Sequence, residues 1–564
     1  MGGSQRESKD AMSDTTLDPW IELSNGPVFG DAAAQAQSRA AMLALSRTTP
    51  QSPRDLHIAT HAASEVAGLV RLPRRETPIP AAPRRPGPRA GAEPARRTNW
   101  DTVPRPVGHV AAPPAAYGAQ WFLRRFFVLI ALAPIGLLLT TRLANLRIDP
   151  ILGAYAVLTL VTTATVMYLA FARYRDPSMI EPRFADPTRT YNPLVSCMVA
   201  VKDERELIAR CLVSMIESDY ENKEIIVVDD GSTDGTSEQL DALSADYPQL
   251  RVIHNDASVG KKRALTRAAA EAKGEILVFT DSDCVLKHDA ISRVIRAFRA
   301  DANLGAVSGH ARALNAHQSF LTRVQDTWYE GQFSVWKAAE ASLHAVSCIS
   351  GPLAAFRREA VFNFFPAWAE DRFLGREFRF ATDRQLTGYV LGNHIVGARL
   401  RHRHRHTPFV ANERHPDRHW RVGYVKSARV WTEVPHSLRR LVKQQVRWKK
   451  SFIRNLFFTG TFYWRRGPLP AFLFYSHVLF ILAMPFMVFR HLVWMPAHGA
   501  FLLTGLYLCG LFFKGSIWAL AYKAEDPRSP NWIYRPFMSL LTACFGPLIL
   551  YSALTLRKGT WSRG

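Results

Sequence analysis

The chain has few cysteines, and their spacing suits neither a disulfide framework nor a metal site. Its 564 residues contain six cysteines, with no CxxC pair and no zinc-ligand spacing. Two of them, Cys509 and Cys544, fall inside long apolar runs. This pattern excludes a disulfide-stapled secreted domain and a zinc ribbon, and it indicates reduced thiols in a cytosol-facing domain.

Acidic residues are also scarce: 48 Asp and Glu stand against 71 Lys and Arg, which gives a net charge of +23. A basic balance of this size invites a nucleic-acid interpretation. The cations gather, however, in the N-terminal tail, beside the apolar runs and in residues 399–465. Cations that flank membrane spans mark the cytoplasmic side and attract anionic lipid. We therefore expect membrane lipid as a partner and no nucleic acid.

The sequence shows no early apolar segment and no internal repeat. We therefore expect no cleaved signal peptide, and we expect the first membrane span to act as the insertion signal. Residues 1–118 are polar and rich in Pro, Ala and Arg, with few large apolar side chains. Such a segment buries too little surface to offset its ordering entropy, so we predict a disordered cytosolic tail over 1–118.

Long apolar runs, by contrast, are abundant. A helix needs about 20 residues to cross a bilayer core, and this length is reached by Trp121–Leu143, Ile151–Phe171, Leu469–Phe489, Phe501–Tyr522 and Trp532–Leu556. The sequence predicts an integral membrane protein with a transmembrane hairpin over 119–172 and a transmembrane region over 469–564. Arginines after the second run place that side in the cytosol. Gly546–Pro547 would allow the last run to break into a re-entrant hairpin, so the number of C-terminal spans stays open.

Residues 190–440 alternate short strands with amphipathic helices. Short apolar runs rich in β-branched residues predict four buried strands, over Leu194–Val201, Glu224–Asp230, Arg251–Asn255 and Glu275–Asp283. Apolar side chains at helical spacing predict helices over Glu204–Ser218 and Lys261–Lys273, the latter capped by Gly274. The alternation predicts an α/β domain with a mostly parallel sheet that binds ligands at the carboxyl ends of its strands.

Carboxylates stand where two of these strands end. Asp281 and Asp283 close the fourth strand, where a strand-to-loop bend would let them converge on one cation. Hard oxygen ligands of this kind suit Mg²⁺ or Mn²⁺. Asp229 and Asp230 close the second strand, where a carboxylate can accept hydrogen bonds from a nucleobase or ribose. The alternatives are a solvated acidic turn and an Asx-type turn.

Cations occur at three unusual places. Lys261, Lys262 and Arg263 occupy the first turn of a predicted helix, whose N-terminus already favours anions. Their presence indicates diphosphate binding, with a solvated surface as the alternative. The run RLRHRHRH (399–406), taken as a strand, would separate arginines from histidines and form a basic surface rather than a zinc site. Lys514 lies inside a predicted span, where it indicates a water-lined path for a polymer or snorkels to the interface.

The basic segment Arg440–Phe458 has apolar residues at helical spacing, and we predict amphipathic helices in the membrane interface over 441–468. This segment contains the last of an ordered set of motifs: VVDDGSTDGT, GKKRAL, TDSD, SGPLAAFRREAV, ATDRQLTGYVLG and QQVRW. The set, over about residues 120–564, resembles the membrane-bound processive β-glycosyltransferases of glycosyltransferase family 2. Hyaluronan synthases and chitooligosaccharide synthases of the Nod-factor type are the most similar groups.

The resemblance implies a GT-A-like cytosolic glycosyltransferase domain over 190–440 on an all-α transmembrane bundle in the plasma membrane. Such an enzyme transfers sugars from UDP-sugars with inversion at the anomeric carbon. It builds a β-linked polysaccharide and exports the growing chain. The leading substrate hypothesis is hyaluronan-type synthesis from UDP-GlcNAc and UDP-GlcA. The alternative is a chitin-type enzyme that uses UDP-GlcNAc alone. A basic membrane-associated polyanion-binding protein is the alternative from another class.

The resemblance also implies roles for matching residues. Asp229 or Asp230 would hold the uracil end of the UDP-sugar, with Lys261 near the nucleotide. Asp281 and Asp283 would place Mg²⁺ or Mn²⁺, and Asp283 would be the more direct ligand.

On the acceptor side, Asp383 would be the general base, and its alternative is an ion pair with Arg384. Other residues would border the acceptor, the product or the diphosphate: Gln444, Arg447, Trp448, Ser350, Gly351 and Arg384. The chain departs from the family pattern at Thr382, where an acid is expected, and at Cys348, which stands one place early.

Overall fold

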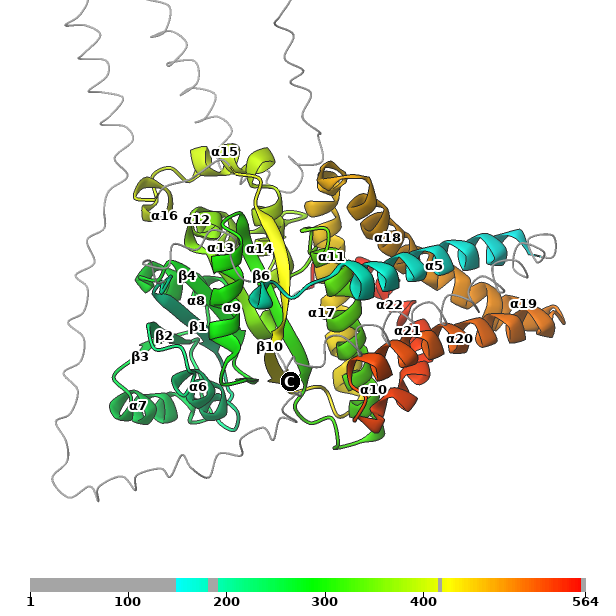
Figure 1. Ribbon diagram of the computed structural model, residues 1–564, viewed down its shortest axis with the longest axis horizontal. Helices are drawn as coiled ribbons and strands as arrows, with labels where there is room; N and C mark the ends of the chain where they lie inside the picture. Colours follow the sequence, from blue (N-terminus) through cyan, green and yellow to red (C-terminus); the bar gives the residue numbers. More distant parts are fainter. Residues whose placement is uncertain (1–148, 181–190, 414–417, 559–564) are drawn as a thin grey trace, which may run out of the picture. The chain divides into compact units, whose positions relative to one another are not determined.

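The computed structural model describes residues 149–180, 191–413 and 418–558 of the chain. The predicted tail over 1–118 and the apolar run Trp121–Leu143 lie outside these residues. In the described part, an α/β domain built on a large sheet is followed by long apolar helices (Figure 1).

The central sheet has eight strands in the order β3-β2-β1-β4-β7-β6-β10-β5. The strands are β1 Val195–Val201, β2 Lys223–Asp229, β3 Leu250–His254, β4 Ile276–Asp281, β5 Cys284–Leu286, β6 Leu304–Ala313, β7 Ala354–Arg357 and β10 Arg421–Thr432. Strands β1 to β4 pair in parallel, β7 runs antiparallel to β4 and β6, and β5 runs antiparallel to β10. The predicted GT-A-like α/β fold is confirmed, with a mixed sheet rather than a mostly parallel one.

All four predicted strands form. The fourth ends at Asp281, two residues earlier than expected, because the chain turns and then pairs again as the short β5 beside β10. The helices that follow the strands are α6 Ile208–Ile216, α7 Thr236–Asp246, α8 Lys261–Glu271 and α9 Ala290–Ala300. Since α8 leads back across the sheet from β3 to β4, right-handed crossovers place it on the face opposite α6 and α7.

Gly274 does not cap α8 as predicted. The helix ends at Glu271, and Ala272 and the next residues are extended. A Cβ at Gly274 would lie 2.6 Å from the backbone nitrogen of Ser196, so the glycine allows the chain to pass close to β1. The requirement is for space beside a strand, not for a left-handed helix cap.

A continuous helical segment joins β6 to the loop before β7. It consists of α10 Phe320–Glu330, the π-helix η5 Gly331–Lys337 and α11 Ala338–Ala341. Single π-helical turns inside α-helices are frequently found at functional sites. This segment packs against the sheet and against the apolar helices, so it connects the two regions.

Between β7 and β10 the chain forms mostly short helices. These elements are η6 Gly351–Leu353, α12 Arg358–Val361, η7 Phe362–Phe364, α13 Phe365–Ala369, β8 Arg372–Phe373, β9 Arg376–Glu377, α14 Thr382–Leu391, α15 Asn393–Arg403 and α16 Pro408–Ala411. The prediction of a strand over RLRHRHRH (399–406) is therefore wrong. The first residues of this run complete α15, and the rest form a turn. The helix and turn leave most of its charged side chains in solvent.

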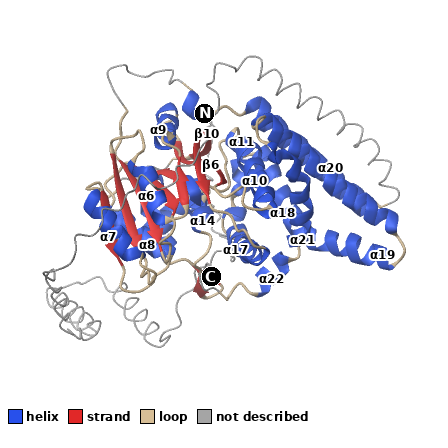
Figure 2. Cartoon of the chain, turned by 90° about the horizontal axis from the view of Figure 1, so that it is seen from below, coloured by secondary structure: helices blue, strands red, loops and turns tan. Residues whose placement is uncertain are grey.

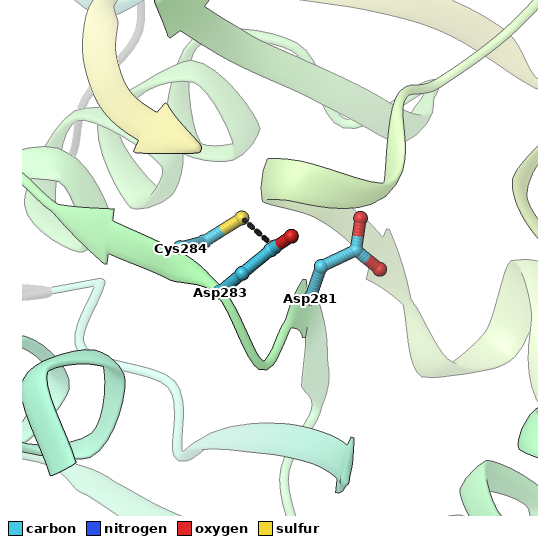
Figure 3. A group of neighbouring side chains, drawn as sticks. All are labelled: Asp281, Asp283 and Cys284. Carbon is cyan, nitrogen blue, oxygen red and sulfur yellow. Dashed lines mark hydrogen bonds between the residues drawn. The ribbon is translucent and has the colours of Figure 1, made fainter. Parts of the chain in front are cut away.

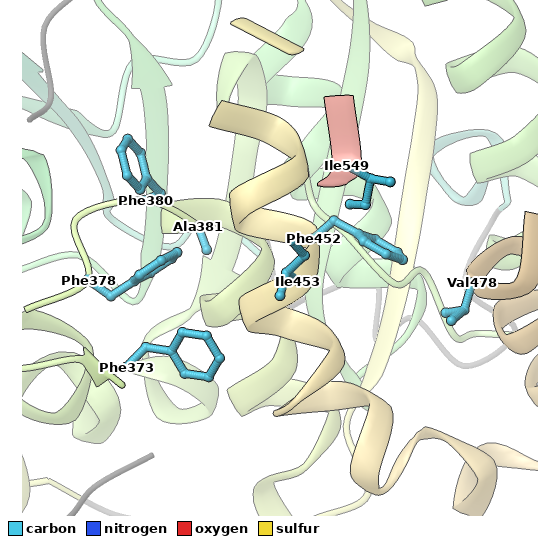
Figure 4. Packing of buried hydrophobic residues seen from close by; sticks show 8 residues of the cluster. All are labelled: Phe373, Phe378, Phe380, Ala381, Phe452, Ile453, Val478 and Ile549. Carbon is cyan, nitrogen blue, oxygen red and sulfur yellow. The ribbon is translucent and has the colours of Figure 1, made fainter. Parts of the chain in front are cut away.

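The basic segment forms the predicted amphipathic helix, α17 Leu438–Leu456, followed by η8 Thr459–Thr461 and η9 Tyr463–Arg466. Ser437 caps its start by accepting a hydrogen bond from the Arg440 N–H. Figure 4 shows how its apolar side chains meet those of the neighbouring segments, in a cluster of Phe373, Phe378, Phe380, Ala381, Phe452, Ile453, Val478 and Ile549. Helix α17 thus packs on the segment before α14 and on two of the apolar helices.

Three helices of the described residues are long and apolar enough to cross a membrane, or four if one bent pair counts as a span. They run over Pro150–Met179 (α5 Pro150–Tyr168, η3 Leu169–Arg173 and η4 Pro177–Met179), Pro468–Ala497 (α18 Pro468–Phe489, η10 Arg490–Trp494 and α19 Met495–Ala497) and α20 Phe501–Glu525. The bent pair is η11 Pro530–Tyr534 with α21 Arg535–Phe545, then α22 Leu548–Leu554, at 40°. The break falls at the predicted Gly546–Pro547.

Leucines and phenylalanines project outward from these helices, which Figure 2 draws beside the sheet. Leu479, Phe486 and Leu502 are 51%, 53% and 72% exposed. Large apolar side chains left open over whole helices are typical of a lipid-facing surface. The prediction of several membrane-spanning helices is therefore supported for the described residues.

A buried charge network joins the sheet to helix α20. Arg312 of β6 donates hydrogen bonds to Asp326 of α10 at 2.8 Å and to Asp526, just after α20, at 3.2 Å. Its guanidinium also donates to the Tyr522 hydroxyl at 2.8 Å. Because each of these groups is satisfied by another, burial of the charges is compensated and the end of strand β6 is held against α20.

Candidate active site

The two predicted metal-binding carboxylates do converge. Asp281 ends β4 and Asp283 lies in the turn before β5, and Figure 3 shows them side by side with Cys284. One ligand atom from each of the three residues lies within 4.8 Å of the other two. The Cys284 thiol donates a 3.4 Å hydrogen bond to Asp283 Oδ1. The turn after β4 thus builds a compact acidic group at the carboxyl end of the parallel strands.

The pKa values of Asp283 and Cys284 are both raised in this group. Burial, and then the neighbouring Asp281 charge, raise the pKa of Asp283 to about 6. Burial and the charge of Asp283 raise the pKa of Cys284 well above its ordinary value, so the thiol stays protonated. Two carboxylates and a neutral thiol provide hard oxygen ligands with little soft-ligand character, which fits Mg²⁺ or Mn²⁺ better than zinc.

Lys261 points from the start of α8 to the acidic group, and its Nζ pairs with Asp281 Oδ1. Burial opposes the charge on Lys261, but the Asp281 carboxylate outweighs this effect and raises the lysine pKa. Arg447 of α17 lies within electrostatic range of both Asp281 and Asp283. The predicted nucleotide-side lysine and the arginine of QQVRW therefore meet at the acidic group, although 186 positions of sequence separate them.

Tyr329 of α10 is a member of the site that the sequence did not single out. Burial, and next the Asp283 charge, raise the pKa of its hydroxyl, and the Arg447 charge opposes this rise. The tyrosine is 7% exposed. A tyrosine between an acidic pair and an arginine offers a neutral hydrogen-bond donor. None of the sequence motifs includes this tyrosine.

Gly351 packs directly on the acidic group. A Cβ at this position would lie 2.8 Å from Asp281 Oδ2, so only glycine fits without a shift. The Thr280 hydroxyl, one residue before Asp281, donates a 2.6 Å hydrogen bond to the carbonyl of Pro352. Ser350 contacts the sheet through its N–H, which donates to the Ser308 hydroxyl at 3.4 Å. The SGP motif thus covers the end of β4.

The candidate base Asp383 lies in the first turn of α14. The preceding Ala381 has a φ of 62°, a left-handed conformation that is unfavourable for a residue with a Cβ. The Asp383 carboxylate accepts hydrogen bonds from the Arg384 N–H at 2.9 Å and from the Cys348 thiol at 3.6 Å. No ion pair between the Asp383 and Arg384 side chains occurs in the described residues, so that alternative is not observed.

The loop of residues 348–352 therefore connects the candidate base Asp383 with the acidic group at the end of β4. Cys348 contacts Asp383 at one end of this loop, and Gly351 contacts Asp281 near the other. The cysteine that stands one place early in the family pattern is the residue that reaches the candidate base. The loop brings the candidate base and the candidate metal ligands to one site.

Lys337 and Glu340 form a second buried group at this loop. The Lys337 ammonium donates to the Cys348 carbonyl, and burial lowers the pKa of this lysine. The Asp383 charge acts on Lys337, which places the lysine near the candidate base. Glu340 accepts hydrogen bonds from the N–H and hydroxyl of Ser347, at 3.2 and 2.6 Å. Neither Lys337 nor Glu340 has a sequence pattern that marks it.

Gln444, Arg447 and Trp448 of QQVRW are three and four positions apart, so they share one side of α17. Trp448 stacks on Trp328 of α10, with ring centroids 5.3 Å apart and planes at 20°. The side-chain oxygen of Gln444 is buried and has no hydrogen-bond partner. A buried acceptor without a donor is costly, so Gln444 is suited to a hydroxyl that the chain does not supply.

Asp229 and Asp230 are buried, at 1% and 2% exposed. Asp230 accepts hydrogen bonds from the N–H groups of Val259 and Gly260, at 2.8 and 2.9 Å, and from the Ser258 hydroxyl at 2.7 Å.

Asp229 accepts a 3.0 Å bond from the Ser232 N–H and contacts the His254 ring at 3.1 Å. The contacts that are described hold the loops around the start of α8, and a direct contact of either carboxylate with a nucleobase stays a prediction.

The three cations at the start of α8 do not act together on a diphosphate. Lys262 is 5% exposed, and its ammonium donates hydrogen bonds to Asp371 at 2.9 Å and to the side-chain oxygen Oε1 of Gln385 at 2.8 Å. Arg263 is half exposed and pairs with Glu377 at 3.4 Å. The prediction is therefore wrong for Lys262, whose charge is neutralised within the chain, and of the three cations Lys261 has the described contact with the acidic group.

Part of the chain is similar in sequence to known glycosyltransferases. Residues 196–362 match Glycosyl transferase family 2. The chain is 30% identical to an N-acetylglucosaminyltransferase of Bradyrhizobium diazoefficiens over 279 residues, which are 49% of this chain and 51% of that protein. It is 26% identical to an N-acetylglucosaminyltransferase of Azorhizobium caulinodans over 433 residues, 76% of this chain and 97% of that protein.

A hyaluronan synthase of Streptococcus pyogenes is 25% identical over 368 residues, 64% of this chain and 80% of that protein. The matched stretch thus spans about half of the Bradyrhizobium relative and most of the other two. Among solved structures, a mannosyltransferase of Pyrobaculum calidifontis in complex with GDP-Man and Mn²⁺ aligns with 72% of this chain and 98% of its own, at 19% identity and a TM-score of 0.43. By its sequence, the chain carries a glycosyltransferase family 2 region over residues 196–362 and is distantly homologous to N-acetylglucosaminyltransferases and hyaluronan synthases.

Proposed function

We propose that the protein is a processive, inverting β-glycosyltransferase that polymerises UDP-sugars and exports the product through its membrane helices. The catalytic domain faces the cytosol at the plasma membrane in this proposal. The observation that supports it most directly is the loop 348–352, which contacts the candidate base Asp383 and the acidic residue Asp281. Glycosyl transfer to a hydroxyl requires a base and a diphosphate-binding group, and the loop contacts a candidate for each.

The proposed step is a single displacement at the anomeric carbon. The Asp383 carboxylate accepts the proton of the acceptor hydroxyl, and the hydroxyl oxygen forms a bond to that carbon. The bond from the anomeric carbon to the β-phosphate oxygen breaks, and its electron pair leaves with UDP. One displacement converts an α-linked donor into a β-linked product.

Positive charge near the diphosphate stabilises the leaving group. Lys261 and Arg447 both lie at the acidic group, where they can contact phosphate oxygens. Asp281 and Asp283 would hold Mg²⁺ or Mn²⁺, which supplies further positive charge to the diphosphate when bound. Trp448, held by its stack on Trp328, presents an aromatic surface for a sugar ring of the acceptor.

The donors are tested by UDP release from the purified protein with Mg²⁺ or Mn²⁺. UDP-GlcNAc, UDP-GlcA and their mixture are supplied in turn, and the product mass is measured. Turnover and high-mass product only with both donors are expected for a hyaluronan-type enzyme. Full turnover with UDP-GlcNAc alone would assign the chitin-type alternative.

A membrane-associated polyanion-binding protein would need none of these acids. The Asp283→Asn variant separates the two possibilities, because at a low, fixed Mn²⁺ concentration it should release UDP much more slowly than the wild type, while any binding of polyanions by the basic surface persists. Absence of UDP release from the wild-type protein with every donor and both metals would contradict the proposed function.

A further inference from the structure

Strand β10 ends beside the acidic group, at Thr432. The last three residues of β10 pair antiparallel with the short strand β5, and Thr432 lies directly opposite Cys284. Side chains directly opposite each other in an antiparallel pair lie on the same face of the sheet. Since Cys284 follows Asp283, the last pair of this ladder brings the Thr432 side chain to the acidic group.

The hydroxyl of Thr432 contacts one of the candidate metal ligands. It donates a hydrogen bond to Asp283 Oδ1, with the two oxygens 3.4 Å apart. The Cys284 thiol donates to the same oxygen, also at 3.4 Å (Figure 3). Thr432 is 5% exposed, so its hydroxyl is held within the protein. Two donors on one carboxylate oxygen restrict rotation of the Asp283 side chain beside Asp281.

The backbone of Thr432 is fixed independently of its hydroxyl. On the side of β10 away from β5, Thr432 pairs with Ala313 of β6. Its carbonyl accepts a 2.8 Å hydrogen bond from the Leu314 N–H. A β-branched side chain of the same shape should therefore replace threonine at this position without a change in the strand.

Strand β10 is also anchored away from the acids. Its pairing with β6 is interrupted over residues 425–428. Within this interruption, the Lys426 ammonium pairs with Glu525, the last residue of α20. The Ser427 N–H donates a 2.7 Å hydrogen bond to the Asp176 carboxylate, between η3 and η4. A side chain on a strand held in this way is positioned more precisely than one on a loop.

We propose that Thr432 is a positioning residue of the metal site, whose hydroxyl orients the Asp283 carboxylate for a divalent cation shared with Asp281. The inference rests on the proposed function and deepens it, because Thr432 acts through Asp283 and is not itself a ligand. In a merely structural role, the hydroxyl would help to pack the end of β10 and the acids would bind the cation equally well without it.

Thr432→Val tests the hydroxyl alone, because valine keeps the β-branched shape and lacks the donor. Binding of Mn²⁺ to the full chain in detergent is measured by electron paramagnetic resonance at one fixed UDP concentration, with the same UDP without protein as the blank. The Mn²⁺ dissociation constant should rise about tenfold, the lower end of the usual cost of losing such a partner, because the Cys284 thiol still donates to the same oxygen. Thr432→Ser keeps the hydroxyl and should stay within about threefold of the wild type.

UDP release gives a second readout. In Thr432→Val the Mn²⁺ concentration for half-maximal release should rise by about the same tenfold factor, while kcat at saturating Mn²⁺ stays within about twofold of the wild-type value. A merely structural role would instead lower kcat and the midpoint of thermal unfolding. Thr266→Val is the matched control, because the Thr266 hydroxyl donates to the Lys262 carbonyl at 2.8 Å within α8. The control should leave both Mn²⁺ measurements unchanged.

Equal Mn²⁺ dissociation constants for the wild type and Thr432→Val would overturn the inference, and so would an absence of bound Mn²⁺ in the wild type. Equal weakening in Thr432→Val and Thr432→Ser would overturn it as well, since packing and not the hydroxyl would then be responsible. The two proposals fail separately. Weaker Mn²⁺ binding in Thr432→Val, without UDP release from the wild type with any donor, would contradict only the enzyme. UDP release with unchanged Mn²⁺ binding in Thr432→Val would contradict only the positioning role.

Discussion

Gly351 lies so close to Asp281 that a Cβ on the glycine would be 2.8 Å from the carboxylate oxygen Oδ2. The contact joins the loop 348–352 to the end of β4, and the same loop reaches Asp383 through Cys348. The position of Asp281 relative to the candidate base therefore depends on the absence of a side chain at residue 351.

Gly351→Ala should lower kcat/KM for UDP release by about 100-fold, because a shift of about 1 Å at a reacting group costs this much. The fold should persist, since Asp281 is able to move toward solvent. Gly505→Ala is the control: nothing lies within 4 Å of a Cβ at that position, which belongs to α20. Wild-type kinetics in Gly351→Ala would show that the loop does not position the acids.

Removal of divalent metal should abolish UDP release, and Mn²⁺ should restore it. Asp283→Asn removes one of two carboxylate ligands, so the Mn²⁺ concentration for half-maximal activity should rise about 10- to 100-fold. Binding of Mn²⁺ measured by electron paramagnetic resonance checks the same loss without activity. Asp241→Asn, an exposed carboxylate of α7, should leave both measurements unchanged. Unaltered Mn²⁺ binding in Asp283→Asn would contradict the metal site.

Trp328→Ala should shorten the product more than it slows donor turnover. The substitution removes the ring that stacks on Trp448, an interaction of about 0.5–1.5 kcal/mol, and lets Trp448 reorient. We expect a broader distribution of shorter products by gel electrophoresis, with a KM for UDP-sugar within about twofold of the wild-type value. Trp328→Phe keeps an aromatic face and should restore most of the length. A product of wild-type length from Trp328→Ala would show that the stack has no role in retaining the acceptor.

Asp371 joins α8 to α17. It accepts a hydrogen bond from Lys262 at 2.9 Å and from Arg454 at 2.7 Å, and all three side chains are buried. Asp371→Asn would leave two buried cations without a neutralising charge, at a cost of about 3–5 kcal/mol in stability. The midpoint of thermal unfolding should fall by several degrees. Glu271→Gln, which breaks the exposed pair with Arg251, should change it little.

The difference in unfolding midpoint between the wild type and Asp371→Asn should shrink as the pH falls. Burial opposes the charge on Asp371, but Lys262 and Arg454 outweigh it and hold the pKa of the carboxyl below its usual range. A carboxylate with a lowered folded-state pKa stabilises the fold above its unfolded pKa, about 3.9, and loses this effect as the pH falls through the folded-state value. The unfolding midpoints of wild type and Asp371→Asn should therefore converge below about pH 4. A constant gap from pH 7 to pH 3 would contradict the role of the ion pair.

The strands and the acids at their ends could be predicted because both depend on local sequence. Short β-branched runs predicted β1 to β4, and the carboxyl ends of parallel strands meet at one edge, so Asp281 and Asp283 were expected together. The antiparallel insertion of β7 could not be predicted, because the four residues Ala354–Arg357 show no pattern of their own. Their place in the sheet is decided by pairing with β4 and β6.

Contacts between distant segments account for the rest of the site. Trp328 and Trp448, or Cys348 and Asp383, are brought together by tertiary packing, and no spacing in the sequence reports such a pair. Lys262 was misassigned for the same reason: its partner Asp371 is 109 positions away. The alternation of RLRHRHRH predicted two faces of a strand, but neither face is apolar enough to bury against a core, and the run forms the end of a helix and a turn instead.

The general base is the central element of the account, and Asp383→Asn tests it most directly. The purified variant is compared with the wild type for UDP release during polymer synthesis and for binding of UDP-sugar with Mn²⁺ by calorimetry. We predict that donor affinity stays within about threefold of the wild-type value, while turnover falls by about 10²- to 10⁴-fold, the usual contribution of general-base catalysis. Turnover near the wild-type rate in Asp383→Asn would contradict the mechanism.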